Sequence, residues 1–219
     1  MILVSQMQSY NKPRPGDVKI LLERDRFLVS LFLNFIVSPQ MIILQGGEDV
    51  KKRTNQSLIK EVGDLSATKK ILVIPWTSES VEKEMTYRHI FTSYFVDSGF
   101  KTVLFLEKGD SEAVVSEKFS SADVIYLPGG DTGVLYRELD LRSLQVKLRG
   151  FKGIIIGNSA GAILLSKGGK GDDKFYTGFG LVDFFITVHF KPEKETLSGT
   201  EMSPIINIPE NMWVAVSMK

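Results

Sequence analysis

A serine between two glycines gives the sequence its clearest candidate for chemistry. Residues 157–161 read Gly-Asn-Ser-Ala-Gly, so Gly157, Ser159 and Gly161 form the pattern G-x-S-x-G. Small neighbours allow the strained turn that exposes a serine hydroxyl at a strand end, and the N–H of Ala160 can then face a developing oxyanion. The pattern predicts Ser159 as a nucleophile. The alternative is a glycine turn that only packs or binds an anion, because so short a pattern also arises by chance.

Residues 128–133 form a second glycine turn, which reads Pro-Gly-Gly-Asp-Thr-Gly and follows an apolar run at 123–127. Glycines let backbone N–H groups approach a ligand closely. The lysine and the hydroxyl residue that complete a phosphate-binding P-loop are absent. We therefore expect this turn to form the second wall of an oxyanion hole beside Ser159. A plain strand–helix connection is the alternative.

A serine nucleophile needs a base, which is most often a histidine, and the chain has two histidines. His89 falls inside an expected helix at 80–98 and is interpreted as a surface or packing residue. His189 ends an apolar run at 184–188, so by elimination it is the candidate base, with a core histidine as the alternative. For the carboxylate that orients the base, the sequence leaves open Glu210, Asp172 and Asp173.

Composition narrows the class of protein. The chain has 219 residues, 43% hydrophobic and 24% charged, which suits a soluble globular protein of one domain, or of one domain plus an appendage. A formal charge of +1 argues against a nucleic-acid partner or an acidic membrane surface. The absence of cysteine excludes disulfides, a thiol nucleophile and thiolate metal sites, and two histidines make a His-rich zinc site improbable.

One apolar segment, residues 27–37, raises the question of a membrane or an interface. It is too short to span a bilayer, and it lies behind a charged run at 23–26, unlike a signal peptide. We expect a buried or interface segment, which would allow a homo-oligomer. A cytoplasmic location is the default.

Strand-like and helix-like patterns alternate from residue 41 onward, which predicts βαβ units and an α/β fold with a mainly parallel sheet. The division expected is an N-terminal extension of unknown role at 1–40 and the α/β domain at 41–219. A helix is expected at 50–62 with Asp49 as its cap, and a mobile loop or lid at 166–180. Sites in such sheets lie at the carboxyl ends of the strands. The expected strands are 41–44, 71–76, 102–106, 123–127 and 153–157.

With these residues in view, the chain resembles the dipeptidase E and cyanophycinase family of serine peptidases over roughly residues 41–216. The resemblance rests on four short motifs: Leu-Pro-Gly-Gly-Asp-Thr at 127–132, Gly-Asn-Ser-Ala-Gly-Ala at 157–162, His-Phe at 189–190 and Pro-Glu-Asn at 209–211. It implies a flavodoxin-like, mainly parallel sheet with helices on both faces, of the class I glutamine-amidotransferase type. It also implies Ser159 as nucleophile, His189 as base, Glu210 or an aspartate of the 172–173 pair as orienting acid, and Gly130 and Ala160 as oxyanion donors.

The resemblance further implies cleavage of short peptides with an N-terminal aspartyl residue, without metal or cofactor. Lysine and glutamate, at 191–194, stand where cyanophycinase-like members carry an arginine-rich run, which favours small peptides over cyanophycin. The predicted function is a serine exopeptidase; the alternatives are a non-catalytic anion-binding protein on the same fold, or another acyl hydrolase such as an esterase or amidase. Asp131 is expected to bind the substrate's α-amino group, and Lys167, Lys170 or Lys174 a carboxylate. The expected substrate-binding residues are Gly129, Asp131, Thr132 and Asn158.

Overall fold

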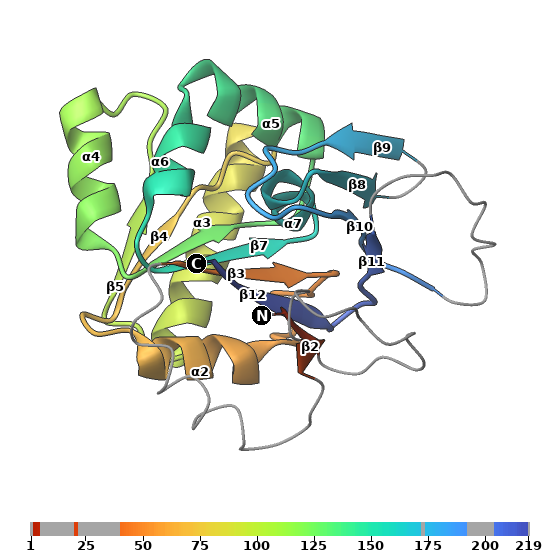
Figure 1. The fold of residues 1–219 in the computed structure, drawn as a ribbon. Coiled ribbons are helices and arrows are strands. Elements are labelled where there is room, and N and C mark those ends of the chain that lie inside the picture. The colour runs from red at the N-terminus through yellow and green to blue at the C-terminus, as the bar shows by residue number, and fades with distance from the viewer. Residues whose placement is uncertain (1, 5–19, 22–39, 172–173, 192–203, 219) are drawn as a thin grey trace.

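The computed structural model describes residues 2–4, 20–21, 40–171, 174–191 and 204–218, and it has two sheets (Figure 1). The main sheet has eight strands. In spatial order they are β2 (Ile20–Leu21), β1 (Ile2–Val4), β12 (Trp213–Met218), β3 (Gln40–Gln45), β7 (Ile154–Asn158), β6 (Val124–Leu127), β4 (Lys70–Val73) and β5 (Thr102–Phe105). Strands β3, β7, β6, β4 and β5 are parallel, whereas β12 runs antiparallel to both β3 and β1.

Helices cover both faces of this sheet, because its central strands are apolar on both sides. Ile42 and Leu44 of β3 face one core, and Ile43 between them faces the other. The helices α2 (Gln56–Leu65) and α3 (Val81–Asp97) close the core that contains Ile43. The opposite core is closed by α4 (Glu112–Ser121), α5 (Thr132–Leu141), α6 (Leu144–Gly150) and α7 (Ala160–Leu165).

The expected helix at 50–62 was wrong at its N-terminal end, since α2 begins at Gln56. Asp49 does not cap that helix. Its Oδ1 accepts hydrogen bonds from the backbone N–H of Lys51 (3.1 Å) and of Lys52 (3.2 Å), so it stabilises a local turn instead. Aspartate side chains often compete with helix formation in this way.

The expectation of a loop over residues 166–180 was also wrong. Strands β8 (Gly168–Gly171) and β9 (Lys174–Thr177) form an antiparallel pair, and with β10 (Phe185–Thr187) and β11 (Ile205–Asn207) they make a second sheet in the order β11-β10-β8-β9. A Cβ on Gly169 would lie 2.3 Å from the carbonyl oxygen of Ile186. Glycine in this segment therefore reflects close strand packing.

The N-terminal residues that the structure describes belong to the main sheet, since Ile2 of β1 pairs with Val216 of β12. The apolar segment at 27–37 lies outside the described residues, so its expected role stays a prediction. Within the described ranges, no helix has the length and apolar character needed to cross a membrane.

Candidate active site

Ser159 lies between β7 and α7 in a backbone conformation that side-chain-bearing residues rarely adopt, with a φ of 48° and a ψ of −103°. The flanking glycines are required by contact. A Cβ on Gly157 would lie 2.6 Å from the backbone nitrogen of Ala162, and one on Gly161 would lie 2.2 Å from the carbonyl oxygen of Leu127. The N–H of Ser159 donates to the carbonyl of Gln45 on the neighbouring strand (3.0 Å), which fixes the turn to the sheet.

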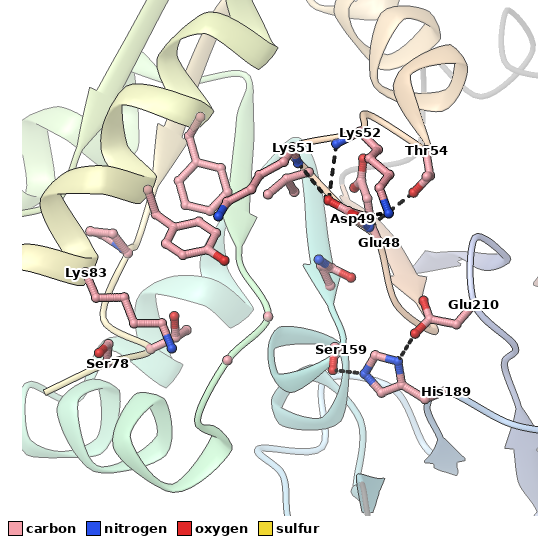
Figure 2. Close-up of a pocket in the computed structure, with 18 of the residues that line it drawn as sticks. Glu48, Asp49, Lys51, Lys52, Thr54, Ser78, Lys83, Ser159, His189 and Glu210 are labelled. Carbon is pink, nitrogen blue, oxygen red and sulfur yellow. Dashed lines mark hydrogen bonds and ion pairs between the residues drawn. The ribbon is translucent and has the colours of Figure 1, made fainter. Parts of the chain in front are cut away.

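A histidine and a glutamate follow the serine in a continuous chain of contacts (Figure 2). Ser159 Oγ lies 2.7 Å from His189 Nε2, and His189 Nδ1 lies 2.5 Å from Glu210 Oε1. In the tautomer with its proton on Nδ1, the ring donates to Glu210 and accepts from the serine hydroxyl. His189 follows β10, and Glu210 lies between β11 and β12. Asp172 and Asp173, the other candidates for the acid, lie outside the described residues.

The turn after β3 holds the histidine and the glutamate in place, a role that the sequence analysis did not foresee. The N–H of His189 donates to the carbonyl of Gly46 (2.7 Å), and the N–H of Asn211 donates to the carbonyl of Gly47 (2.9 Å). A Cβ on Gly47 would lie 2.3 Å from Glu210 Oε2 and 2.5 Å from His189 Cε1. The available signal was a glycine pair directly after a buried strand, the same signal that marked the turn after β6.

The two expected oxyanion donors, Gly130 and Ala160, belong to the turn after β6 and to the turn that holds Ser159. Ala160 is the first residue of α7, so its N–H has no acceptor within that helix. Gly129 packs against Ser159, because a Cβ placed there would lie 3.4 Å from Ser159 Cβ. Gly130 has a φ of 140°, and a Cβ on it would lie 2.7 Å from Thr77 Cβ. This arrangement is compatible with an oxyanion hole, and the two donors stay a prediction.

Ser159 opens onto a cavity of about 790 Å³, which has the size of small-molecule sites. Its walls come from the turn after β3, from α3, from the turn after β6 and from the loop before β12 (Figure 2). They include Glu48, Asp49, Lys51, Lys52, Ser78, Lys83, Glu84, Tyr87, Phe91, Gly129, Gly130, Asn158, Ser159, His189, Glu210 and Asn211.

Glu48 is the most unusual carboxylate of this cavity. Its Oε1 accepts from the hydroxyl of Tyr94 and from the N–H of Asn55 (3.3 Å), and its Oε2 has no hydrogen-bond partner among the residues that the structure describes. Burial raises the pKa of the Glu48 carboxyl above its ordinary value, because desolvation disfavours the charged form.

The expected substrate-binding residues divide between two places. Gly129 and Asn158 line the cavity that holds Ser159. Asp131 caps α5 by accepting from the N–H of Val134 (3.0 Å), and it lines an adjoining hollow rather than this cavity. Thr132 is buried at the start of α5 and lines neither space.

The lysines expected to meet a carboxylate lie elsewhere. None of Lys167, Lys170 and Lys174 lines the cavity, and Lys167 pairs with Asp183 (2.5 Å). The cavity instead has Lys51, Lys52 and Lys83, which the sequence analysis did not single out. His89 is exposed on α3, as expected. In the described part of the chain, no group of three or more His, Asp or Glu is arranged to hold a metal ion.

The protein has a flavodoxin-like α/β fold of the class I glutamine-amidotransferase type, with a mainly parallel sheet and helices on both faces. The model of peptidase family S51 matches residues 41–218. A crystal structure of a peptidase from an acI-B1 Actinobacterium has the same fold, with a TM-score of 0.64 at 20% identity over 82% of this chain and 84% of that chain. A 1.5 Å crystal structure described as a peptidase E protein from Listeria monocytogenes EGD-e gives a TM-score of 0.54 at 22% identity over 71% of this chain and 82% of that chain.

No curated protein matches the chain significantly. The family model alone covers most of the sequence, so the chain belongs to peptidase family S51, the dipeptidase E family, and is a serine peptidase. The family resemblance and the fold class expected from the sequence are thereby confirmed.

Proposed function

We propose that the protein is a serine exopeptidase that hydrolyses small peptides through Ser159, His189 and Glu210. The observation that carries the proposal is the unbroken contact chain from Ser159 Oγ through the imidazole to Glu210, at the edge of a cavity large enough for a short peptide. Membership of family S51 disfavours the alternative of a non-catalytic anion-binding protein.

In the proposed reaction, His189 takes the proton of Ser159 as the hydroxyl attacks the scissile carbonyl. The N–H groups of Gly130 and Ala160 stabilise the oxyanion. His189 then passes the proton to the leaving amine, and a water activated by the same imidazole releases the acyl group. Glu210 accepts the Nδ1 proton, which selects the reactive tautomer and stabilises the imidazolium.

The preference for an N-terminal aspartyl residue belongs to this proposal and is supported by the family resemblance. A homo-oligomer and a cytoplasmic location, both expected from the sequence, also stay predictions.

Labelling with a fluorophosphonate probe tests the nucleophile and the acid together. The wild type should be labelled and Ser159→Ala should not. Glu210→Gln should slow labelling strongly, on the order of 10⁴-fold, because the amide favours the wrong tautomer. The matched control Asp173→Asn should label at the wild-type rate. Equal labelling of Ser159→Ala and the wild type would refute the nucleophile, and slow labelling of Asp173→Asn with fast labelling of Glu210→Gln would transfer the acid's role to Asp173.

A further inference from the structure

Three lysines line the cavity, and they differ in their partners. Lys52 Nζ lies 3.2 Å from Asp49 Oδ2, so its charge is balanced within the protein. Lys51 and Lys83 also line the cavity, and neither has a carboxylate within ion-pair distance among the residues that the structure describes. Two ammonium groups are therefore left with unbalanced charge.

The carboxylates of the cavity do not balance these two lysines. Glu210 contacts His189, and Glu84 Oε1 lies 2.7 Å from Arg88 Nη2. Asp49 is paired with Lys52. Glu48 accepts hydrogen bonds from the Tyr94 hydroxyl and from the N–H of Asn55, and neither lysine lies within ion-pair distance of it. None of these carboxylates therefore lies within ion-pair distance of Lys51 or Lys83.

Lys51 comes from the turn after β3 and Lys83 from α3, and both side chains lie on the α3 side of the cavity (Figure 2). Lys51 Nζ lies 5.6 Å from the centre of the Tyr87 ring, a cation–π contact that positions the ammonium at little cost in solvation. Tyr87 and Lys83 are four residues apart on α3 and so share one side of the helix. Figure 2 shows Lys51 and Lys83 on the α3 side of the cavity, with Ser159, His189 and Glu210 on the other side.

We propose that Lys51 and Lys83 form a subsite for a carboxylate of the peptide whose carbonyl reacts at Ser159, an inference that rests on the proposed function. Two ammonium groups on one wall suit a carboxylate, and charge-assisted hydrogen bonds of this kind are among the stronger polar contacts. The carboxylate can come from the peptide's C-terminus or from an acidic side chain. Lys51 and Lys83 take the role that the sequence suggested for Lys167, Lys170 or Lys174.

The test is steady-state kinetics with four peptides that separate the two sources: an aspartyl dipeptide, its C-terminal amide, and the asparaginyl counterparts of both. In Lys51→Met and in Lys83→Met, KM should rise about tenfold for the peptides that carry the recognised carboxylate, with a smaller change in kcat. If KM rises only for peptides with a free C-terminus, the subsite binds the terminal carboxylate. If KM rises only for aspartyl peptides, the subsite binds the side-chain carboxylate.

Lys60→Met is the matched control, because Lys60 is an exposed lysine on α2 that does not line the cavity. It should keep the wild-type discrimination between carboxylate and amide peptides. The inference is overturned if Lys51→Met and Lys83→Met keep that discrimination, or if they raise KM equally for all four peptides, which would indicate a structural role.

A binding measurement separates failure of the subsite from failure of the proposed function. Calorimetry with the same peptides on Ser159→Ala, alone and combined with Lys51→Met, requires no turnover. If the wild type hydrolyses none of the peptides, the proposed peptidase activity on these substrates fails. If Ser159→Ala binds the peptides only when they carry the carboxylate, and Lys51→Met abolishes that binding, the result would still support the subsite. Binding that does not depend on the carboxylate, or no binding, would overturn it.

Discussion

The position of the Ser159 hydroxyl depends on an unusual backbone conformation. A φ of 48° with a ψ of −103° is rare for a residue with a Cβ, and such conformations cost about 1–3 kcal/mol. The turn persists because Gly157 and Gly161 allow the chain to pack against Leu127 and against itself, and because the Ser159 N–H is bonded to β3. The result is a hydroxyl that faces both the cavity and the imidazole of His189.

Glu48 leads to a prediction about stability and pH. Because burial raises its pKa in the folded protein above the ordinary value of 4.5, the native state holds this proton at pH values where the unfolded chain has lost it. The free energy of unfolding of the wild type should therefore fall as the pH rises through a window that opens near 4.5 and ends at the folded pKa. In Glu48→Gln, which keeps an acceptor for Tyr94 and Asn55, the fall should be smaller than in the wild type by the contribution of Glu48.

Urea denaturation of both proteins at a series of pH values measures the effect. The variant should gain stability relative to the wild type as the pH rises, and the difference should be constant below the window. The corresponding change at Glu117, which is exposed on α4, should reproduce the wild-type pH profile. A Glu48→Gln profile parallel to that of the wild type at every pH would contradict the assignment.

Single residues were predictable from the sequence where a local pattern required them. The G-x-S-x-G spacing pointed to Ser159, and the scarcity of histidine pointed to His189. The choice between Glu210 and Asp173 was not available, because it depends on which loop folds back to the imidazole. Glu48, Lys51 and Lys83 carry no local signal, since charged residues in loops are ordinarily solvated.

At the scale of elements, three turns at the carboxyl ends of adjacent parallel strands build the site. The turn after β7 holds Ser159, the turn after β6 packs against it, and the turn after β3 contacts His189 and Asn211 through its carbonyl groups. Each turn contains glycines that face a neighbouring backbone or side chain at distances that exclude a Cβ. The close approach of these turns follows from the sheet order.

Gly47→Ala should damage catalysis more than folding. A methyl group at this position would lie 2.3 Å from Glu210 Oε2 and 2.5 Å from His189 Cε1, so the pair must shift by a large part of an ångström. We expect kcat to fall by about 10²-fold, the effect of a displacement of this size at a catalytic group. Stability should fall by about 1–3 kcal/mol, as for other overpacked sites.

Gly150→Ala is the matched control, because a Cβ at the end of α6 meets nothing within 4 Å. It should leave kcat unchanged and raise stability by up to about 1 kcal/mol. Peptide hydrolysis and urea denaturation of both variants provide the comparison. If Gly47→Ala loses stability but keeps kcat, the turn after β3 does not position the catalytic pair.

Strands could be predicted from the sequence where their residue types match their burial in the sheet. The apolar runs at 41–44, 71–76 and 123–127 overlap the central strands β3, β4 and β6, because residues buried on both faces must be apolar, although β4 ends at Val73. The strand β8 reads Gly-Gly-Lys-Gly and lacks every residue type that favours strands, so its pairing with β9 and β10 was not apparent. The antiparallel insertion of β12 beside β3 also could not be predicted, since strand order is a property of the whole chain.

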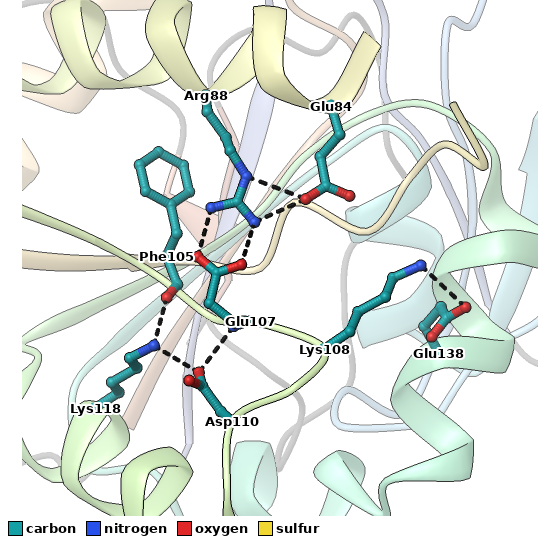
Figure 3. A network of polar contacts seen from close by, with 8 residues as sticks. All are labelled: Glu84, Arg88, Phe105, Glu107, Lys108, Asp110, Lys118 and Glu138. Atoms are coloured by element: carbon teal, nitrogen blue, oxygen red, sulfur yellow. Dashed lines mark hydrogen bonds and ion pairs between the residues drawn. The ribbon is translucent and has the colours of Figure 1, made fainter. Parts of the chain in front are cut away.

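At the scale of the whole molecule, a network of ion pairs joins the cavity wall to the far elements of the main sheet (Figure 3). Arg88 of α3 contacts Glu84 on its own helix and Glu107 in the segment after β5 (both 2.7 Å). The N–H of Glu107 donates to Asp110, which pairs with Lys118 of α4 (2.5 Å). The network therefore fixes α3, which has Lys83 and Tyr87 on the cavity wall, to the segment between β5 and α4.

Arg88→Met should weaken both the fold and substrate binding. The Arg88 and Glu84 side chains are only 13% and 16% exposed, so removal of the guanidinium leaves a poorly solvated carboxylate without its partner. We expect a loss of about 1–3 kcal/mol in the free energy of unfolding. Because α3 is then less firmly held, KM for short peptides should rise while kcat changes less, since Ser159, His189 and Glu210 lie on other elements.

Lys147→Met provides the comparison on the surface. Lys147 pairs with Glu112, which is 76% exposed, and exposed pairs contribute at most about 1 kcal/mol. Urea denaturation and peptide kinetics of the two variants, repeated at high salt, measure both effects. The loss in the free energy of unfolding caused by Arg88→Met should persist at high salt, because salt screens partly buried ion pairs less than exposed ones. If Arg88→Met loses no more stability than Lys147→Met, or if kcat falls with KM unchanged, the network does not hold the cavity wall in place.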